Sequence, residues 1–153
     1  MCYNWMRQPD QAIAEAKRAL ELDPNFFLAF GELARALTQK GLYDEAIAAI
    51  KDQGHPRLRG LLGYVYAVAG RTGDAQKVLD ELKGMPRRRF GDAFALVRIH
   101  AALGENDQAF EWLQKARDER DSLVIWLKVD PTLDNLRSDP RFNKVLEEMG
   151  LPP

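Results

Sequence analysis

The sequence predicts an all-α protein built as a solenoid of stacked helical pairs, and three observations support this fold class. Apolar residues recur with the spacing of a helix face along most of the 153 residues, and no convincing strand alternation appears. Glycine or proline ends nearly every such segment, and the connections are short. Alanine recurs at Ala12, Ala46, Ala75 and Ala109, with spacings of 34, 29 and 34 residues. A period of this length is typical of helical repeats that stack side by side.

Three helices are expected in the first third of the chain, over residues 10–22, 27–40 and 43–52. Asp10 is a suitable N-cap for the first helix, and the pair Asp23-Pro24 ends it. Gly41 ends the second helix, because glycine readily adopts the left-handed conformation found at helix C-termini. Gly54 ends the third helix in the same way.

Four more helices are expected over residues 57–69, 73–83, 90–103 and 106–118. Gly70, Gly84 and Gly104 follow the first three of them, and the charged sequence DERD follows the last. Short connections of this kind join antiparallel neighbours, so the helices are expected to pack as consecutive pairs. No change in composition divides the chain before residue 120.

The tail is composed of shorter elements. The sequence SLVIWLKVDP (122–131) predicts a short apolar helix that ends near its proline, and 132–138 predicts one further turn. Asp139 followed by Pro140 is a typical helix start, so a last helix is expected over 140–149.

We interpret residues 122–153 as a cap over the last helical pair. The end of a solenoid exposes an apolar face that must be covered. Trp126 is expected to bury the cap against the helix 106–118, together with its apolar neighbours Leu123, Val124, Ile125 and Leu127.

These patterns resemble the tetratricopeptide repeat, whose first helix follows W-x₂-L-G-x₂-Y and whose second follows A-x₃-F-x₂-A before a proline. Ala12, Ala19 and the sequence Leu-Asp-Pro at 22–24 match the end of the second helix most closely. The first pattern recurs in degraded form around Leu33-Ala34, Leu62-Gly63 and Leu96-Val97.

The resemblance covers residues 1–121 and implies a right-handed superhelix of helical hairpins with capping helices at its C-terminal end. It divides the chain into a partial repeat, a shortened repeat, two further repeats and the cap: 1–26, 27–55, 56–89, 90–121 and 122–153. It also implies a non-catalytic scaffold that binds other proteins.

Three features depart from the repeat pattern. Tyr3 lies in the aromatic position of a helix whose first turns are missing, so the chain is expected to begin inside a repeat, as a fragment or with its first helix completed by something else. The 29-residue spacing removes five residues from the helix 43–52, about 7 Å of helix, and predicts a kink at 53–56. Arg59 occupies a usually aromatic position and predicts a thinner contact between the second and third helical pairs.

The sequence from 109 to 151 is similar to the C-terminal end of bacterial signalling proteins that carry these repeats. In those proteins a DNA-binding winged helix, a kinase or a cyclase domain precedes the repeats. The similarity implies that the chain is the regulatory or scaffolding part of a larger bacterial protein. It does not identify the effector domain.

Motifs and composition argue against an enzyme. One cysteine, Cys2, and two separated histidines, His55 and His100, do not reach the usual ligand count of a zinc site, so no metal and no cofactor are expected. The sequence contains no glycine-rich phosphate loop, nucleophile elbow or H-E-x-x-H motif. His100 falls in a tyrosine position of the repeat and is expected to pack between helices.

Charge and hydropathy limit the partners. The net charge of −1 provides no field that would attract nucleic acid or an anionic membrane. The run Arg87-Arg88-Arg89 is interpreted as a solvated loop, with contact to an acidic partner as the alternative. No apolar run approaches the roughly 20 residues of a membrane span, and no signal peptide is evident. We therefore expect a cytoplasmic protein with no membrane contact through this segment.

The family's groove lies on one face of the first helix of each pair. Carrying that face over residue by residue gives a candidate partner-binding set of Arg35, Gln39, Arg57, Tyr64, Phe94 and Arg98. Arg35, Tyr64 and Arg98 occupy equivalent positions and should form one row, in which the guanidinium groups bind carboxylates of a protein or peptide. Tyr64 and Phe94 would supply apolar contacts. The alternative, that this face is ordinary solvated surface, stays open.

A second functional hypothesis is self-assembly. Trp5 and Met6 have little to cover them if the first helix is incomplete. The chain would then form a homo-oligomer through its N-terminal end, as a structural module.

Overall fold

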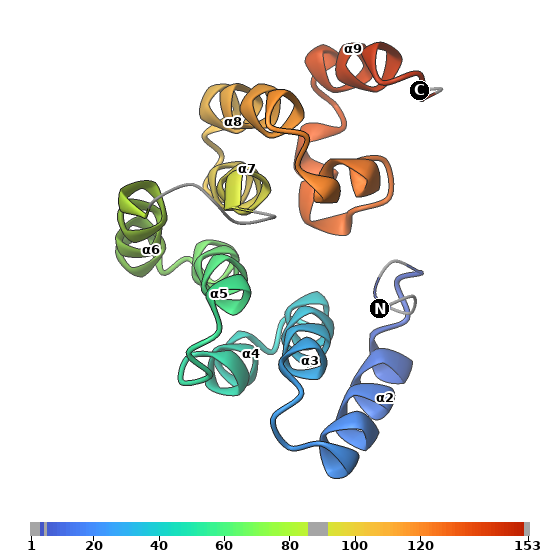
Figure 1. The fold of residues 1–153 in the computed structure, drawn as a ribbon, viewed down its shortest axis with the longest axis vertical. Coiled ribbons are helices and arrows are strands. Elements are labelled where there is room, and N and C mark those ends of the chain that lie inside the picture. Colours follow the sequence, from blue (N-terminus) through green and yellow to red (C-terminus); the bar gives the residue numbers. More distant parts are fainter. Residues whose placement is uncertain (1–3, 5, 86–91, 152–153) are drawn as a thin grey trace.

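The helices form an arc, which Figure 1 shows in a computed structural model that describes residues 4, 6–85 and 92–151. The described chain contains helices and no strand, as the periodicity predicts. The helices are α2 (Pro9–Leu22), α3 (Phe27–Gln39), α4 (Tyr43–Ile50), α5 (Pro56–Val68), α6 (Thr72–Gly84), α7 (Asp92–Ala102), α8 (Asn106–Asp118) and α9 (Pro140–Glu148), with two 3₁₀ helices, η1 (Ser122–Trp126) and η2 (Pro131–Leu136).

Consecutive helices pack as hairpins. Helix α3 packs against α2 and α4, α5 packs against α6, and α7 packs against α8. Helices α3, α5 and α7 lie on the inner side of the arc, whereas α4, α6 and α8 lie on its outer side (Figure 1). The predicted all-α solenoid of helical hairpins is therefore confirmed.

The four periodic alanines lie in the core. Ala12 is 5% exposed, and Ala46, Ala75 and Ala109 are completely buried. A small side chain at these positions lets two helix axes approach to the short end of the usual 8–10 Å range. The spacing in the sequence thus marks buried positions that a small side chain occupies in each repeat.

The turn inside each hairpin repeats with the same spacing as the alanines. Gly41, Gly70 and Gly104 each adopt a left-handed backbone conformation, with φ of 75°, 74° and 77°. Arg7 adopts it as well, with φ of 56°, and lies 34 residues before Gly41. The left-handed conformation costs an L-residue about 1–2 kcal/mol, so Arg7 occupies a position that favours glycine.

Helix α4 is the short element of the solenoid. It has 8 residues, whereas α3 has 13, as the 29-residue spacing predicts. Gly54, with φ of 62°, turns the backbone toward α5. The kink of the superhelix at 53–56 stays a prediction.

The core consists of two groups of buried side chains that meet along α5. One group joins α3 and α4 to the first three turns of α5, and the other joins the end of α5 to α6, α7, α8 and the cap. Helix α5 packs more extensively on α7 than on α3. Helix α4 also packs on α5, so the thinner contact expected from Arg59 stays a prediction. Arg59 itself pairs with Glu81 of α6 at the surface.

Two predicted element boundaries are wrong. Asp10 is not the N-cap of α2, because the helix begins at Pro9 and its N-cap is Gln8. The carboxylate of Asp10 instead pairs with Lys40 at 2.6 Å. Pro131 does not end a helix but begins η2, since the preceding apolar segment forms only the short helix η1.

The cap is packed by Val124 and Leu127, which are 5% and 0% exposed. Trp126 and Ile125, which were expected to share this role, are 37% and 67% exposed. A 3₁₀ helix has three residues per turn, so positions 124 and 127 face the core together and the residues between them face outward. The tryptophan prediction is therefore wrong, and the division of the chain at residue 122 stays a prediction.

The start of the described chain reaches across the inner side of the arc. Asn4 is 2% exposed, and its side-chain amide donates to both the backbone carbonyl and the carboxylate of Glu32 on α3, each at 2.9 Å. Arg7 pairs with Asp134 of η2 at 2.7 Å. The start of the chain thus contacts η2 of the cap through this pair. The predictions for Tyr3, Trp5 and residues 87–89 lie outside the described residues.

Candidate binding groove on the inner face

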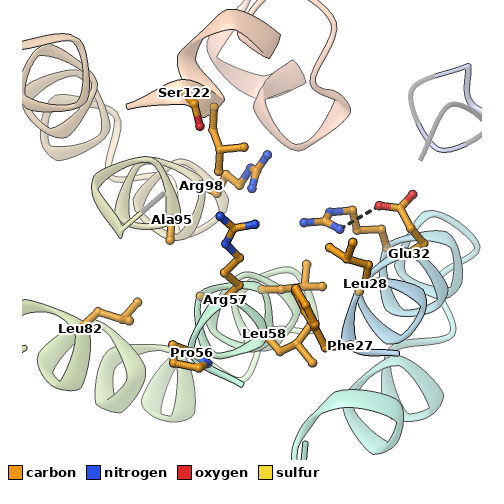
Figure 2. A pocket seen from close by; sticks show the side chains of 15 residues that line it. Phe27, Leu28, Glu32, Pro56, Arg57, Leu58, Leu82, Ala95, Arg98 and Ser122 are labelled. Carbon is orange, nitrogen blue, oxygen red and sulfur yellow. Dashed lines mark hydrogen bonds and ion pairs between the residues drawn. The ribbon is translucent and has the colours of Figure 1, made fainter. Parts of the chain in front are cut away.

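The inner face contains a cavity of about 160 Å³ between the inner helices (Figure 2). Its polar lining consists of Glu32 and Arg35 from α3, Arg57 from α5, and Arg98 from α7, with Ser122 at its edge. Apolar and small side chains complete it, among them Phe27, Leu28, Gly31, Leu58, Gly60, Ala95 and Leu123. Three of the six predicted binding residues therefore reach one cavity.

Glycine lets the helices below the cavity approach closely. A Cβ atom on Gly60 would lie 2.6 Å from the Cβ of Ala95, much closer than two such carbons can approach. A Cβ on Gly31 would lie 3.3 Å from Nη1 of Arg35. The absent side chains thus set the spacing of α5 and α7 and leave room for the guanidinium groups above them.

Arg98 is held by a buried ion pair with Asp130. Nε and Nη2 of Arg98 donate to one carboxylate oxygen of Asp130 at 3.0 and 2.5 Å, and the two side chains are 9% and 1% exposed. The other oxygen of Asp130 accepts from the backbone N–H and the hydroxyl of Thr132, at 3.0 and 2.7 Å, which caps η2. The pair therefore joins the last inner helix to the cap.

The pKa of Asp130 is lowered by this environment. Burial alone would raise the pKa, but the charge of Arg98 and the hydrogen bonds from Arg98 and Thr132 outweigh burial. The carboxylate is consequently ionised in the folded protein at neutral pH, and Arg98 has an internal partner.

Arg35 has an internal partner too. Its Nη1 lies 3.2 Å from a carboxylate oxygen of Glu32, and its side chain is 28% exposed. Burial and the nearby charge of Arg98 lower the pKa of Arg35. The like charges of Arg35 and Arg98 are therefore close enough to destabilise each other.

Arg57 differs from both. It is exposed, and among the described residues its guanidinium group makes no hydrogen bond or ion pair. Figure 2 shows this side chain extending into the cavity between Arg98 and the α3 side. His55 fixes the start of α5 beneath it, because its Nδ1 accepts from the Arg57 backbone N–H at 3.2 Å and its ring stacks on Phe27 at 3.7 Å.

A smaller cavity, of about 60 Å³, lies beside the first. Arg35, Gln39 and Tyr64 line it together with Asn4 and residues 130–132 of the cap. Gln39 donates to the backbone carbonyl of Asn4 at 3.1 Å, so the start of the chain already occupies part of this face.

Burial raises the pKa of Tyr64 to about 12, with a further contribution from the negative charge of Asp130. The unfolded chain releases this proton at its usual pKa of about 10, whereas the folded protein retains it. Stability contributed by the neutral phenol should therefore be lost as the pH rises from about 10 to about 12. When the pH is raised above about 9, the free energy of unfolding measured in urea should fall less for Tyr64→Phe than for the unchanged protein. An equal fall in the free energy of unfolding for both proteins would contradict this expectation.

The structure changes the candidate set in two ways. Phe94 is completely buried and lies under Arg98, 4.8 Å from ring centroid to guanidinium carbon, so it is corrected to a core residue and cannot contact a partner. Glu32 and Asp130, which form ion pairs with Arg35 and Arg98, are not among the residues predicted from the sequence. For Asp130 a signal existed, because Asp130-Pro131 has the same helix-starting form as Asp139-Pro140.

His100 packs in the core, as expected from its position in the repeat. It is 3% exposed, and its Nδ1 lies 2.5 Å from the carboxylate of Glu105. Within residues 4, 6–85 and 92–151, no group of three or more His, Cys, Asp or Glu side chains is placed to hold a metal ion. No helix of the same ranges is long and apolar enough to cross a membrane.

Comparison with known families identifies a match over the first third of the chain. The family model described as tetratricopeptide repeat matches residues 6–53, which include α2, α3 and α4. No solved structure matches the chain.

Proposed function

Because this chain is a tetratricopeptide repeat protein, we propose that it is a non-catalytic scaffold that binds a protein or peptide segment in its inner groove. Repeats of this family generally mediate protein–protein interactions and are typically non-catalytic. We further propose that the partner binds on the inner face and that the bound segment is acidic.

The observation that carries the proposal is the unpaired guanidinium group of Arg57 above a cavity of about 160 Å³. A cation with no partner among the described residues, placed beside the partly buried Arg35 and Arg98, favours an anionic group from outside. Leu28, which is 37% exposed, supplies apolar surface at the same cavity.

Arg35 and Arg98 each pair with a carboxylate of the protein itself, which orients them in the cavity. In this proposal Arg57 is the main contact for the bound segment, and the remaining N–H groups of Arg35 and Arg98 assist it. A micromolar affinity, about −8 kcal/mol, is typical of a transient partner of this kind.

Site-specific photo-crosslinking in the source cells tests the proposal. A photoreactive amino acid at Leu28 should capture a defined partner, and Arg57→Glu should abolish that capture because a like charge then faces the acidic segment. Arg18→Glu on α2 is the matched control, since Arg18 is exposed and, among the described residues, its guanidinium group pairs with Glu15 alone. It should leave the captured partner unchanged.

Two outcomes would contradict the proposal. One is the same capture with and without Arg57→Glu, which would remove the groove from the interaction. The other is measurable turnover by the isolated chain. Because Arg57 has no described side-chain partner, its replacement should spare the fold, which the helical circular dichroism of the variant checks.

We also propose, from the similarity of the tail, that the chain serves as the regulatory part of a larger bacterial protein. Self-assembly through the N-terminal end is the second candidate, favoured by Met6, which is 61% exposed. Light scattering over a concentration series separates self-assembly from binding of a different partner in the groove. A molecular mass that stays monomeric at every concentration contradicts self-assembly.

A further inference from the structure

Guanidinium groups from the three inner helices converge on one cavity. Arg35, Arg57 and Arg98 come from α3, α5 and α7 and all line the cavity of about 160 Å³. One water needs roughly 10–15 Å³, so the cavity has room for a polyatomic group. Gly60 and Ala95 below the arginines keep this room open.

The charges in the cavity do not balance among the described residues. Glu32 and Asp130 each offset one arginine, and Arg57 has no counterpart. The repulsion between Arg35 and Arg98 lowers the pKa of Arg35 in addition to burial, although both acids oppose this effect. An additional anion is therefore favourable at this point.

Unused hydrogen-bond donors indicate which anion fits best. Arg57 offers all of its N–H groups, Arg98 retains Nη1 and Arg35 retains Nε and Nη2 beyond their bonds to Asp130 and Glu32. A carboxylate has two oxygens and a single negative charge, so it can accept from each arginine but leaves several of these donors unused. A phosphate monoester has more acceptor oxygens and carries a charge of about −1.5 to −2 at neutral pH.

We propose that the cavity around Arg57 is an oxyanion site that binds the phosphate group of a phosphorylated side chain on the protein partner. The proposal rests on the proposed function, since it specifies what the partner presents to the groove. The net charge of −1 disfavours a nucleic acid strand, which needs a row of cations along successive phosphates. The structure places these arginines around one cavity, where a single phosphate group fits.

Binding of small probes to the complete chain tests the site. N-acetyl-phosphoserine methylamide is expected to bind at least about tenfold more tightly than N-acetyl-glutamate methylamide, measured by calorimetry. Its affinity should rise between about pH 5 and pH 7 as the phosphate takes its second charge, and the glutamate probe should lack this step.

Two variants of α5 provide the control. Arg57→Gln should weaken binding of the phosphoserine probe by about tenfold or more, because it removes the free fork of donors. Arg59→Gln removes an arginine two positions away that pairs with Glu81, and it should leave the affinity unchanged.

Equal affinity for the two probes would overturn the phosphate assignment, and so would tighter, competing binding of a single-stranded oligonucleotide. Phosphatase treatment separates this inference from the proposed function. If the Leu28 crosslink persists after the cell extract is dephosphorylated, the phosphate site is wrong and groove binding stands. If the phosphoserine probe binds but no partner is captured, the proposed function fails and the site stands.

Discussion

Replacing Asp130 with alanine is expected to lower the free energy of unfolding by about 3–5 kcal/mol, the usual cost of removing one partner from a buried ion pair. Arg98 would be left charged in a position where its side chain is 9% exposed. The N-terminus of η2 would also lose the carboxylate that accepts a hydrogen bond from the backbone N–H of Thr132. Urea unfolding measures the loss, and a change below about 1 kcal/mol would show that the pair does not hold the cap.

Asp134→Ala is the matched control, because Asp134 lies on the same short helix but its pairs with Arg7 and Arg137 are partly exposed. Pairs of this kind contribute about 0–1 kcal/mol. A similar loss for both variants would mean that any change in η2 unfolds the cap, irrespective of the buried charge.

The ion pair should also give the protein a defined acid response. Since the folded pKa of Asp130 is lowered, its contribution is complete above the unfolded pKa of about 3.9 and is lost as the pH falls through the folded value. The difference in stability between the unchanged protein and Asp130→Asn should be constant from about pH 5 to pH 7. It should shrink below about pH 4.

Gly60→Ala is expected to destabilise the fold by about 1–2 kcal/mol, although alanine is the better helix former by about 1 kcal/mol. The new methyl group would lie 2.6 Å from the Cβ of Ala95, which is attached directly to the backbone of α7 and cannot rotate away. Helices α5 and α7 must then separate. Because Arg57 and Arg98 lie above this contact, the binding of the phosphoserine probe should weaken as well.

Gly73→Ala is the control for helix propensity. Gly73 lies in the first turn of α6, where an added Cβ meets nothing within 4 Å. This variant should be as stable as the unchanged protein or slightly more stable. A stabilising Gly60→Ala would show that the two helices have room to spare, and that the glycine does not set their distance.

The repeat architecture was predictable because its determinants are local. The spacing of four alanines and the glycines that end helices depend on the period of the helix and on backbone sterics, which act within one hairpin. The same spacing in Gly41, Gly70 and Gly104 follows from the same turn in each repeat. In the cap, the segment 122–131 forms only the short 3₁₀ helix η1, whose three-residue period turns Trp126 outward, whereas the turn expected over 132–138 agrees with η2.

The groove was predictable only in part. Arg35, Arg57 and Arg98 were assigned to one face, and they do line one cavity. Their pairing depends on contacts that a periodic pattern does not contain, such as the bond from Arg98 to Asp130, 32 residues later. Phe94 lies four residues before Arg98 on the same helix side, where the arginine covers it and buries it completely.

The contact between the start of the chain and η2 has a consequence for how the protein unfolds. Separate repeats interact only with their neighbours, so an open solenoid frays from either end independently. Here Arg7 connects the start of the chain to Asp134 of η2, 127 residues later. Because an exposed pair of this kind contributes about 0–1 kcal/mol, fraying at one end weakens the other end only slightly, and hydrogen-exchange protection at the two ends should be weakly coupled.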